Sequence, residues 1–351
     1  MKKIIYLVII MSFALMESAF AQRPYRVGTT AANFLEIGYG SQGIAMGDAL
    51  VSSVDDVSGI YWNPAGLAYM EHSEAQVMYQ PWIAGINTAF VGVGVVVPSI
   101  GTLGIGMVNI SYGEMDVTSL DAQDGTGERF KAGEYAFSLT YSRLITEWFA
   151  FGASAKYIAS NIWHVTASAL AIDLGVIVHT HFFSVTGNRA DGLKIGMSIA
   201  NYGTRLRYDG LDLIQPIDIL PSESGNYADT PGQYRLSEWE LPLIFRIGIS
   251  AIVFKQDNHN VTVAVDALHP NNNAESINAG LQYALNVPGT GQFFLRGGSK
   301  GMFLPESEFG WSFGAGFQKL LMDNMSIKFD YAMRNMGLFG NFHSYSFGFT
   351  F

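Results

Sequence analysis

Few residues of this chain combine the type and spacing that catalysis or metal binding requires. His179 and His181 are two residues apart, so on a strand they would share a face, but they fall at an expected turn without a carboxylate pair nearby. Asp121, Asp124 and Glu128 could offer oxygen ligands to calcium, but their spacing is not that of an EF-hand loop. We interpret both groups as surface residues and expect no metal site.

Other motifs for chemistry are also missing. The sequence has no H-E-x-x-H pair and no phosphate-binding P-loop, and the spacing of its Ser, His and Asp residues does not suggest a catalytic triad. It has 0 Cys, which excludes disulfides and thiolate chemistry. We therefore expect a protein that is not an enzyme and that has no cofactor.

Eight charged residues share a different pattern, because each occupies the polar phase of a segment that alternates between apolar and polar residues. A charged side chain on a membrane strand is costly where it faces lipid, so we expect all eight to line the lumen of a barrel, paired with one another or with a plug. A solvated, paired wall is a simpler interpretation than a substrate-selective path. The residues are Lys156, Asp173, Lys194, Arg246, Asp266, Lys328, Asp330 and Arg334.

The alternation that places these charges runs from residue 75 to the end of the chain. The composition is 49% hydrophobic and 14% charged, yet the chain after residue 22 has no apolar run of about 18 residues, the length of a membrane helix. These features predict an all-β protein, a transmembrane barrel of fourteen antiparallel strands over residues 75–351. A phase change between Met107 and Val108 predicts a β-bulge. The strands are expected near 75–80, 87–98, 102–112, 133–143, 148–159, 168–180, 192–202, 242–254, 260–268, 275–285, 291–299, 308–318, 324–334 and 343–351.

The last seven residues carry the clearest strand pattern. Tyr345, Phe347, Phe349 and Phe351 fall on one face, with small or polar residues between them. The alternative to a membrane barrel is a secreted β-sandwich or propeller, which has no reason to end on its most aromatic strand. This terminal strand is similar to the signal by which outer-membrane barrels are recognised for assembly.

The first residues resemble a secretory signal peptide. Lys2 and Lys3 precede an apolar run over residues 4–15, and Ala19 and Ala21 provide the small-x-small cleavage pattern. We expect residues 1–21 to be removed near Ala21 and the mature chain to lie in the outer membrane of a Gram-negative-type bacterium, in contact with its lipid. Cleavage removes a net charge of +1 from a chain of formal net charge −10, and the resulting −11 argues against nucleic-acid binding.

The connections alternate between short turns and longer loops. An even strand number with both termini in the periplasm makes each odd-numbered connection extracellular, and the periplasmic turns are short except for 181–191. The extracellular connections include the long segments 113–132 and 203–241. The second is the candidate partner-binding loop, since a long apolar connection usually docks a partner or folds as a lid on its neighbours. Its apolar residues are Leu211, Leu213, Ile217, Ile219 and Leu220.

Residues 36–70 do not alternate, and there the chain resembles a known family. SQGIAMGDA (41–49), the pair at 55–56 and YWNPAGLA (61–68) are similar to the N-terminal signature of the PorV/PorQ family, within the FadL-like group of fourteen-stranded barrels. The resemblance implies that residues 22–74 form an N-terminal segment with a hatch inside the barrel, which a lumen of this width needs if it is to be filled. The hatch motif residues it marks are Met46, Gly47, Asp55, Asp56, Asn63, Pro64, Ala65 and Gly66.

The same resemblance implies two functions. Likeness to PorV implies a role in type IX secretion, in which extracellular loops receive cargo proteins from the secretion translocon and pass them to the surface attachment complex. Likeness to the FadL group implies, as the alternative, a transporter that admits hydrophobic small molecules past the hatch. The portions at 34–37 and 45–49 favour PorV.

Overall fold

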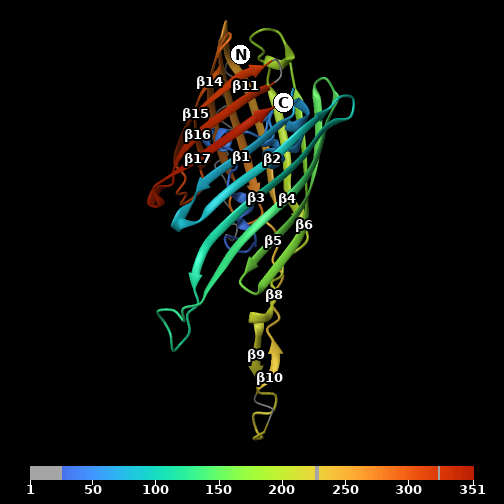
Figure 1. Ribbon diagram of the computed structural model, residues 1–351. Helices are drawn as coiled ribbons and strands as arrows, with labels where there is room; N and C mark the ends of the chain where they lie inside the picture. Colours follow the sequence, from blue (N-terminus) through green and yellow to red (C-terminus); the bar gives the residue numbers. More distant parts are fainter. Residues whose placement is uncertain (1–25, 226–228, 323–324) are drawn as a thin grey trace, which may run out of the picture.

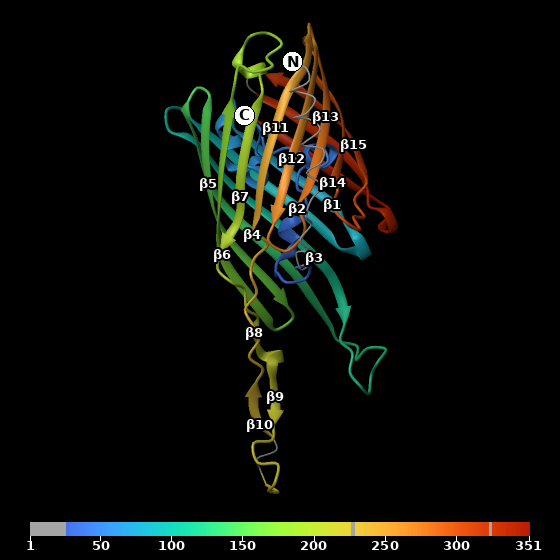
Figure 2. The same cartoon turned by 180° about the vertical axis from the view of Figure 1, so that it is seen from behind.

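The chain folds as one closed, tilted sheet, seen from two sides in Figures 1 and 2. The computed structural model describes residues 26–225, 229–322 and 325–351. In this part of the chain, fourteen long strands form the wall, and β1 (Glu74–Pro81) pairs antiparallel with β17 (Asn341–Thr350) to close it. The other wall strands are β2 (Asn87–Val97), β3 (Gly101–Asp116), β4 (Arg129–Thr146), β5 (Phe149–Ile162), β6 (Val165–His179), β7 (Lys194–Gly203), β11 (Ile244–Gln256), β12 (His259–Pro270), β13 (Ser276–Val287), β14 (Gly291–Met302), β15 (Trp311–Met322) and β16 (Met325–Asn335).

The predicted antiparallel barrel is confirmed, and each predicted strand overlaps an observed one. On β4, Phe137 and Leu139 face outward and are exposed, whereas Ser138 and Thr140 face inward and are buried. This division recurs around the wall and produces an outer apolar band that suits lipid. None of the helices in the described ranges is both long and apolar enough to cross a membrane.

The predicted bulge between Met107 and Val108 is wrong. The β2–β3 register runs unbroken through this point, and β3 instead shifts against β4 between Ser111 and Glu114. Met107 faces outward, while Val108 and Ile110 face inward and are buried in the core around residues 34–65. The apparent phase change arose because part of the lumen wall is apolar where it packs against that core.

The β3–β4 hairpin is longer than its apolar pattern indicated. Beyond the expected ends of the strands, Glu114 forms an ion pair with Lys131 at 3.1 Å, and Asp116 with Arg129 at 3.0 Å. These charged residues continue the ladder outside the apolar band, so the connection shrinks from 113–132 to 117–128. An alternation of apolar and polar residues reports only the lipid-facing part of such a strand.

The barrel has two different ends. The turn end carries the short connections around residues 98–100, 147–148, 257–258 and 288–290, together with the described C terminus. The 180–193 connection also lies there and contains the 3-10 helix η4 (Arg189–Asp191). Burial acts to raise the pKa of Asp191, but hydrogen bonds from Lys255 and Thr186 lower it below its usual value, so this carboxylate pins the long turn to β11.

The loop end carries the other connections, including the 3-10 helices η3 (Ile83–Gly85) and η6 (Gly337–Phe339). The 203–241 segment begins with β8 (Asp209–Gly210), which pairs with β6, and η5 (Leu211–Leu213). It continues as a separate hairpin of β9 (Ile214–Ile217) and β10 (Thr230–Gln233). Figures 1 and 2 show this hairpin projecting far beyond the barrel, so it is not a lid on its neighbours.

The hatch, residues 33–70, threads through the lumen between the two ends. It consists of η1 (Asn33–Glu36), α2 (Ser41–Ala45), α3 (Gly59–Trp62) and η2 (Pro64–Tyr69). Just before it, the Ala31 amide donates to the Glu240 carbonyl at the loop end, and after it β1 starts at the turn end. Ala31 therefore lies at the end of the barrel opposite the described C terminus, whereas the N terminus, which was expected on the periplasmic side, falls outside the described residues. The connections alternate between the two ends because β1 begins and β17 ends at the turn end.

Candidate functional site

An ion-pair cluster anchors the first half of the hatch to the barrel wall. The Asp48 carboxylate lies between Arg334 of β16 and Lys300 of β14, whose Nζ is 2.8 Å from Asp48 Oδ2. Arg334 Nη2 also donates to the Ile44 carbonyl at 3.2 Å. Asp48 and Arg334 are buried, so each charge depends on its partner for compensation.

Asn63 performs the same task for the second half of the hatch. Its Nδ2 donates to the Val51 carbonyl at 2.8 Å and to the Val176 carbonyl of β6 at 3.2 Å. Its Oδ1 accepts from the Ala65 amide at 3.1 Å, capping η2, in which Pro64 occupies the first turn. Asn63 thus joins two hatch segments to the wall, which explains the Asn-Pro pair physically.

Inward-facing glycines of the wall let the hatch backbone approach closely. A Cβ placed on Gly175 would lie 2.0 Å from Asn63 Oδ1, one on Gly152 2.3 Å from the Pro64 carbonyl carbon, and one on Gly280 2.4 Å from the Met46 carbonyl oxygen. At Gly47 the glycine belongs to the hatch and the backbone that it approaches belongs to the wall. Its φ is +65°, and a Cβ there would collide with the backbone of Ser299. Hatch and wall are therefore in direct contact at these positions.

The remaining motif residues have different surroundings. Met46, Ala65 and Asp56 are buried, and Asp56 Oδ1 accepts from the Ser58 amide at 3.0 Å. A Cβ on Gly66 would lie 2.5 Å from Val54 Cγ1. Asp55 is the exposed residue among them, and it lines a cavity together with Met46 and Asp56.

An aromatic cluster fills the centre of the hatch. Trp62 Nε1 donates to the Tyr39 carbonyl at 2.8 Å, and the Tyr61 hydroxyl donates to the Leu35 carbonyl at 3.1 Å. The guanidinium of Arg246 lies 5.7 Å from the Tyr61 ring centroid, so one predicted lumen charge contacts the hatch through a ring. This cluster belongs to the main apolar core, which lies inside the barrel.

The eight charged residues predicted to line the lumen all lie on the inner face of the wall. Lys156 and Asp173 pair with each other at 2.5 Å between buried side chains. The Asp266 carboxylate accepts from the Val51 amide of the hatch at 2.9 Å. Three more of the eight pair with charged residues outside the predicted set. Lys328 pairs with Glu74 at 2.8 Å, Asp330 with Arg296, and Arg334 with Asp48. Lys194 lines a cavity in the lumen.

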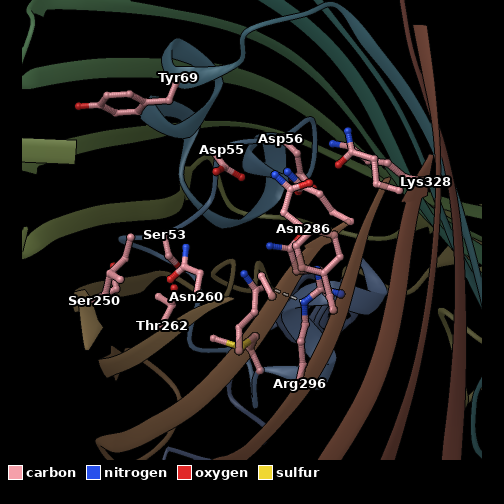
Figure 3. Close-up of a pocket in the computed structure, with 18 of the residues that line it drawn as sticks. Ser53, Asp55, Asp56, Tyr69, Ser250, Asn260, Thr262, Asn286, Arg296 and Lys328 are labelled. Carbon is pink, nitrogen blue, oxygen red and sulfur yellow. Dashed lines mark hydrogen bonds between the residues drawn. The ribbon is translucent and has the colours of Figure 1, made fainter. Parts of the chain in front are cut away.

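That cavity lies between the hatch and the turn end and has a volume of about 630 Å³. Figure 3 shows Asp55, Asp56 and Lys328 on one side of it, and Ser250, Asn260 and Thr262 on another. Asn286 of β13 and Arg296 of β14 line the cavity from two adjacent wall strands (Figure 3). Its lining is rich in charges of both signs, which suits water and polar solutes rather than an apolar molecule.

The predicted partner-binding loop is largely exposed. The exposed fraction is 68% for Leu211, 57% for Ile219 and 39% for Leu220. Leu213 is half-buried. Ile217 is 42% exposed but also contacts the opposite strand, because a Cβ on Gly232 would lie 2.1 Å from Ile217 Cδ1. Ile217 therefore contributes to the packing of the hairpin as well as to its exposed surface.

The two histidines considered for chemistry have different partners. His179 stacks on Tyr69 with 4.1 Å between ring centroids, while His181 accepts from Arg189 Nε at 3.1 Å. The described residues contain no group of three or more His, Asp or Glu side chains that could hold a metal ion.

Residues 310–314 read G-W-S-F-G, the spacing of a hydrolase nucleophile elbow. In the structure Ser312 lies within β15, not at a strand-to-helix turn. Its hydroxyl is buried at 3.2 Å from both the Ala45 and the Gly298 carbonyl oxygens. Ser312 therefore links hatch and wall and has no access to a substrate.

Several of these residues were missed in the sequence, namely Asp48, Lys300, Arg296, Glu74 and the wall glycines. Glycines in the lumen phase of strands, such as Gly152 and Gly175, are a readable signal, because a strand interior disfavours glycine unless a backbone approaches closely. Asp48 and Lys300 have no such signal, since they are far apart in sequence.

Comparison with known proteins agrees with this architecture. Residues 20–219 match the family described as "Type IX secretion system protein PorV". No curated protein matches the sequence.

Two solved structures show the same fold. The toluene transporter TodX of Pseudomonas putida has a TM-score of 0.53 at 12% identity, covering 89% of this chain and 96% of that one. The Ralstonia pickettii toluene transporter TbuX has a TM-score of 0.52 at 12% identity, covering 89% and 97%.

Proposed function

Since the chain belongs to the PorV family of type IX secretion system proteins, we propose that it is a non-catalytic partner in that secretion route. In this role the outer-membrane barrel is a rigid platform. Its loop end receives secreted proteins from the translocon and passes them to surface attachment. The alternative, by fold likeness to TodX and TbuX, is uptake of hydrophobic molecules through the lumen.

The projecting hairpin is the observation that carries this proposal. Leu211, Ile219 and Leu220 are exposed on a segment that extends beyond every other connection in Figure 1. Exposed apolar residues gathered on one segment are typical of a protein contact site. The hairpin also offers two unpaired strand edges, because β9 and β10 pair only with each other among the described strands.

The lumen supports the secretion role over uptake. Wall glycines contact the hatch backbone directly, and buried ion pairs and hydrogen bonds join the two. The cavity on the turn side is lined by charged and polar groups such as Asp55, Lys194 and Lys328. Entry of an apolar solute into such a cavity would cost free energy, because the solute would displace water from the charged groups without replacing their hydration.

The test is a triple variant in which Leu211, Ile219 and Leu220 are each replaced by Ser. Leu213 and Ile217 are left intact, so the hairpin keeps its own packing. In the matched control, Ser replaces Leu120, Phe303 and Leu338, which are exposed on three other loop-end connections. We measure surface display of secreted proteins, co-purification of secretion components, and folded barrel by heat-modifiable migration.

We expect both variants to assemble and only the hairpin variant to lose display and co-purification. Normal display by the hairpin variant would contradict the proposal. If uptake of toluene fell in the same cells while display stayed normal, the transporter function would replace it.

A further inference from the structure

A groove of about 570 Å³ lies near the loop end of the barrel. It forms where the wall ladder is interrupted. Residues 171 and 172 of β6 pair with 203 and 202 of β7, and residues 165 and 166 pair with 210 and 209, but the ladder is broken between these points. There the chain turns away from β6, since Leu206 forms a bridge with Trp239 instead.

The strand phase shows that this groove opens on the outer face. Ala159 of β5 is opposite Ser168 of β6, and Tyr135 of β4 is opposite Ala159, so one outward-facing row crosses three strands. The small side chains of Ala159 and Ser168 form the floor. Tyr135 and Tyr157 stand on one side, with ring centroids 6.4 Å apart, and Arg205 and Arg207 on the other.

The groove borders the lipid-facing band. Leu170, with 62% of its side chain exposed, pairs with Tyr157 directly below the floor, and Ile172 and Leu174 continue the apolar face toward the turn end. Above the floor, Asn161 pairs with Thr166, which also pairs with Asp209. The groove therefore lies where the apolar band gives way to polar residues, at head-group level, and tyrosine is typical of this level.

The lining has no net charge. Arg205 and Arg207 are offset by Asp209 and Glu238, and Arg207 lies 3.6 Å from Glu238. Within the described chain, the side chains of Asn161, Thr166 and Ser168 make no hydrogen bond, so their donors and acceptors are available. A ligand here meets aromatic faces together with neutral and balanced polar groups, a combination that suits a sugar better than an anion.

We propose that this outer groove binds the saccharide of an outer-leaflet glycolipid, with Tyr135 and Tyr157 against the sugar rings and Asn161, Thr166 and Ser168 bonding the hydroxyl groups. The glycolipid is favoured as the source because the groove is continuous with the lipid-facing surface at Leu170. This proposal does not rest on the secretion role. The floor of the groove lies on the barrel wall, and its four charged residues lie at the base of the 203–241 segment, outside the hairpin of β9 and β10.

The test uses the full-length mature barrel in detergent micelles and in nanodiscs. The probes are lipopolysaccharide, its dephosphorylated oligosaccharide released from the lipid, and phosphatidylglycerol, with binding followed by native mass spectrometry and titration. The variant is Ser168→Tyr, which fills the floor from an exposed position. The control is Ser111→Tyr, which adds the same ring at an outward, exposed position of β3 that does not line the groove.

We expect wild-type and Ser111→Tyr barrels to bind lipopolysaccharide and the dephosphorylated oligosaccharide, and Ser168→Tyr to bind both at least tenfold more weakly. Heat-modifiable migration checks that both variants are folded, and Asn161→Ala provides a milder variant with partial loss. Equal binding by Ser168→Tyr and wild type would overturn the proposal. Binding of lipopolysaccharide and phosphatidylglycerol without binding of the oligosaccharide would also overturn it, because the phosphate and not the sugar would be recognised.

Discussion

The hatch and the projecting hairpin are both irregular insertions into a regular barrel, but they differ in what holds them. The hatch has buried ion pairs, side-chain hydrogen bonds to the wall and direct backbone contact at wall glycines. The hairpin pairs only with itself among the described strands and exposes most of its apolar side chains. The difference indicates that the hatch is a fixed part of the barrel's core, whereas the hairpin is free to be shaped by a partner.

Removal of the Asp48 carboxylate from the hatch should have the largest effect on stability. Asp48→Ala leaves the buried Arg334 and the half-buried Lys300 without a carboxylate, and loss of one partner of a buried pair costs about 3–5 kcal/mol. We expect that decrease in the free energy of unfolding, measured by urea titration of the barrel in lipid vesicles.

The control for this variant is Asp212→Ala near the hairpin, where Asp212 pairs with His164 at 2.9 Å and both side chains are partly exposed. Exposed pairs contribute about 0–1 kcal/mol, so this change should be small. Similar losses for both variants would show that the hatch is no better anchored than the hairpin.

A second, smaller effect concerns the wall glycines. Gly175→Ala places a Cβ against Asn63 Oδ1, and overpacking of this kind typically costs about 1–3 kcal/mol. Gly297→Ala is the matched control, since its Cβ would lie 3.3 Å from the outward ring of Phe313. We expect a lower melting temperature for Gly175→Ala alone. An unchanged melting temperature would mean that the hatch yields easily.

A covalent link between the hatch and the wall should affect stability least. The hydroxyls of Ser41 in α2 and Ser346 in β17 are 2.8 Å apart, so cysteines at both positions should form a disulfide in the folded barrel. The chain has 0 Cys, which leaves no competing thiol. We expect cross-linking, detected by gel mobility, without loss of the secretion phenotype. The Ser41→Cys, Ser326→Cys pair, with Ser326 at the far end of the wall, should not cross-link. Secretion abolished by the Ser41–Ser346 link would show that the hatch must move.

Much of the fold was predictable because a strand's period of two is a local property. Residues 135–142 and 325–334 show the alternation directly, and the strand number and antiparallel order follow from counting such segments. The local rule failed at Val108, where an apolar residue faces inward, and at 114–131, where charged residues continue a strand beyond the membrane. Val108 packs against the hatch, and residues 114–116 pair with residues 129–131 of the next strand. In both places a contact with another element, and not the local alternation, determined the structure.

The barrel, its lumen charges and the hatch motif could be recognised from the sequence, because the alternation and the 41–68 signature are local patterns. How these parts meet depends on the three-dimensional structure. Asp48 finds Lys300 and Arg334 across more than 250 positions, and Gly175 is small because Asn63 stands against it. Such contacts depend on the closure of the sheet around the hatch, which brings together residues whose separation in sequence carries no information about their distance in space.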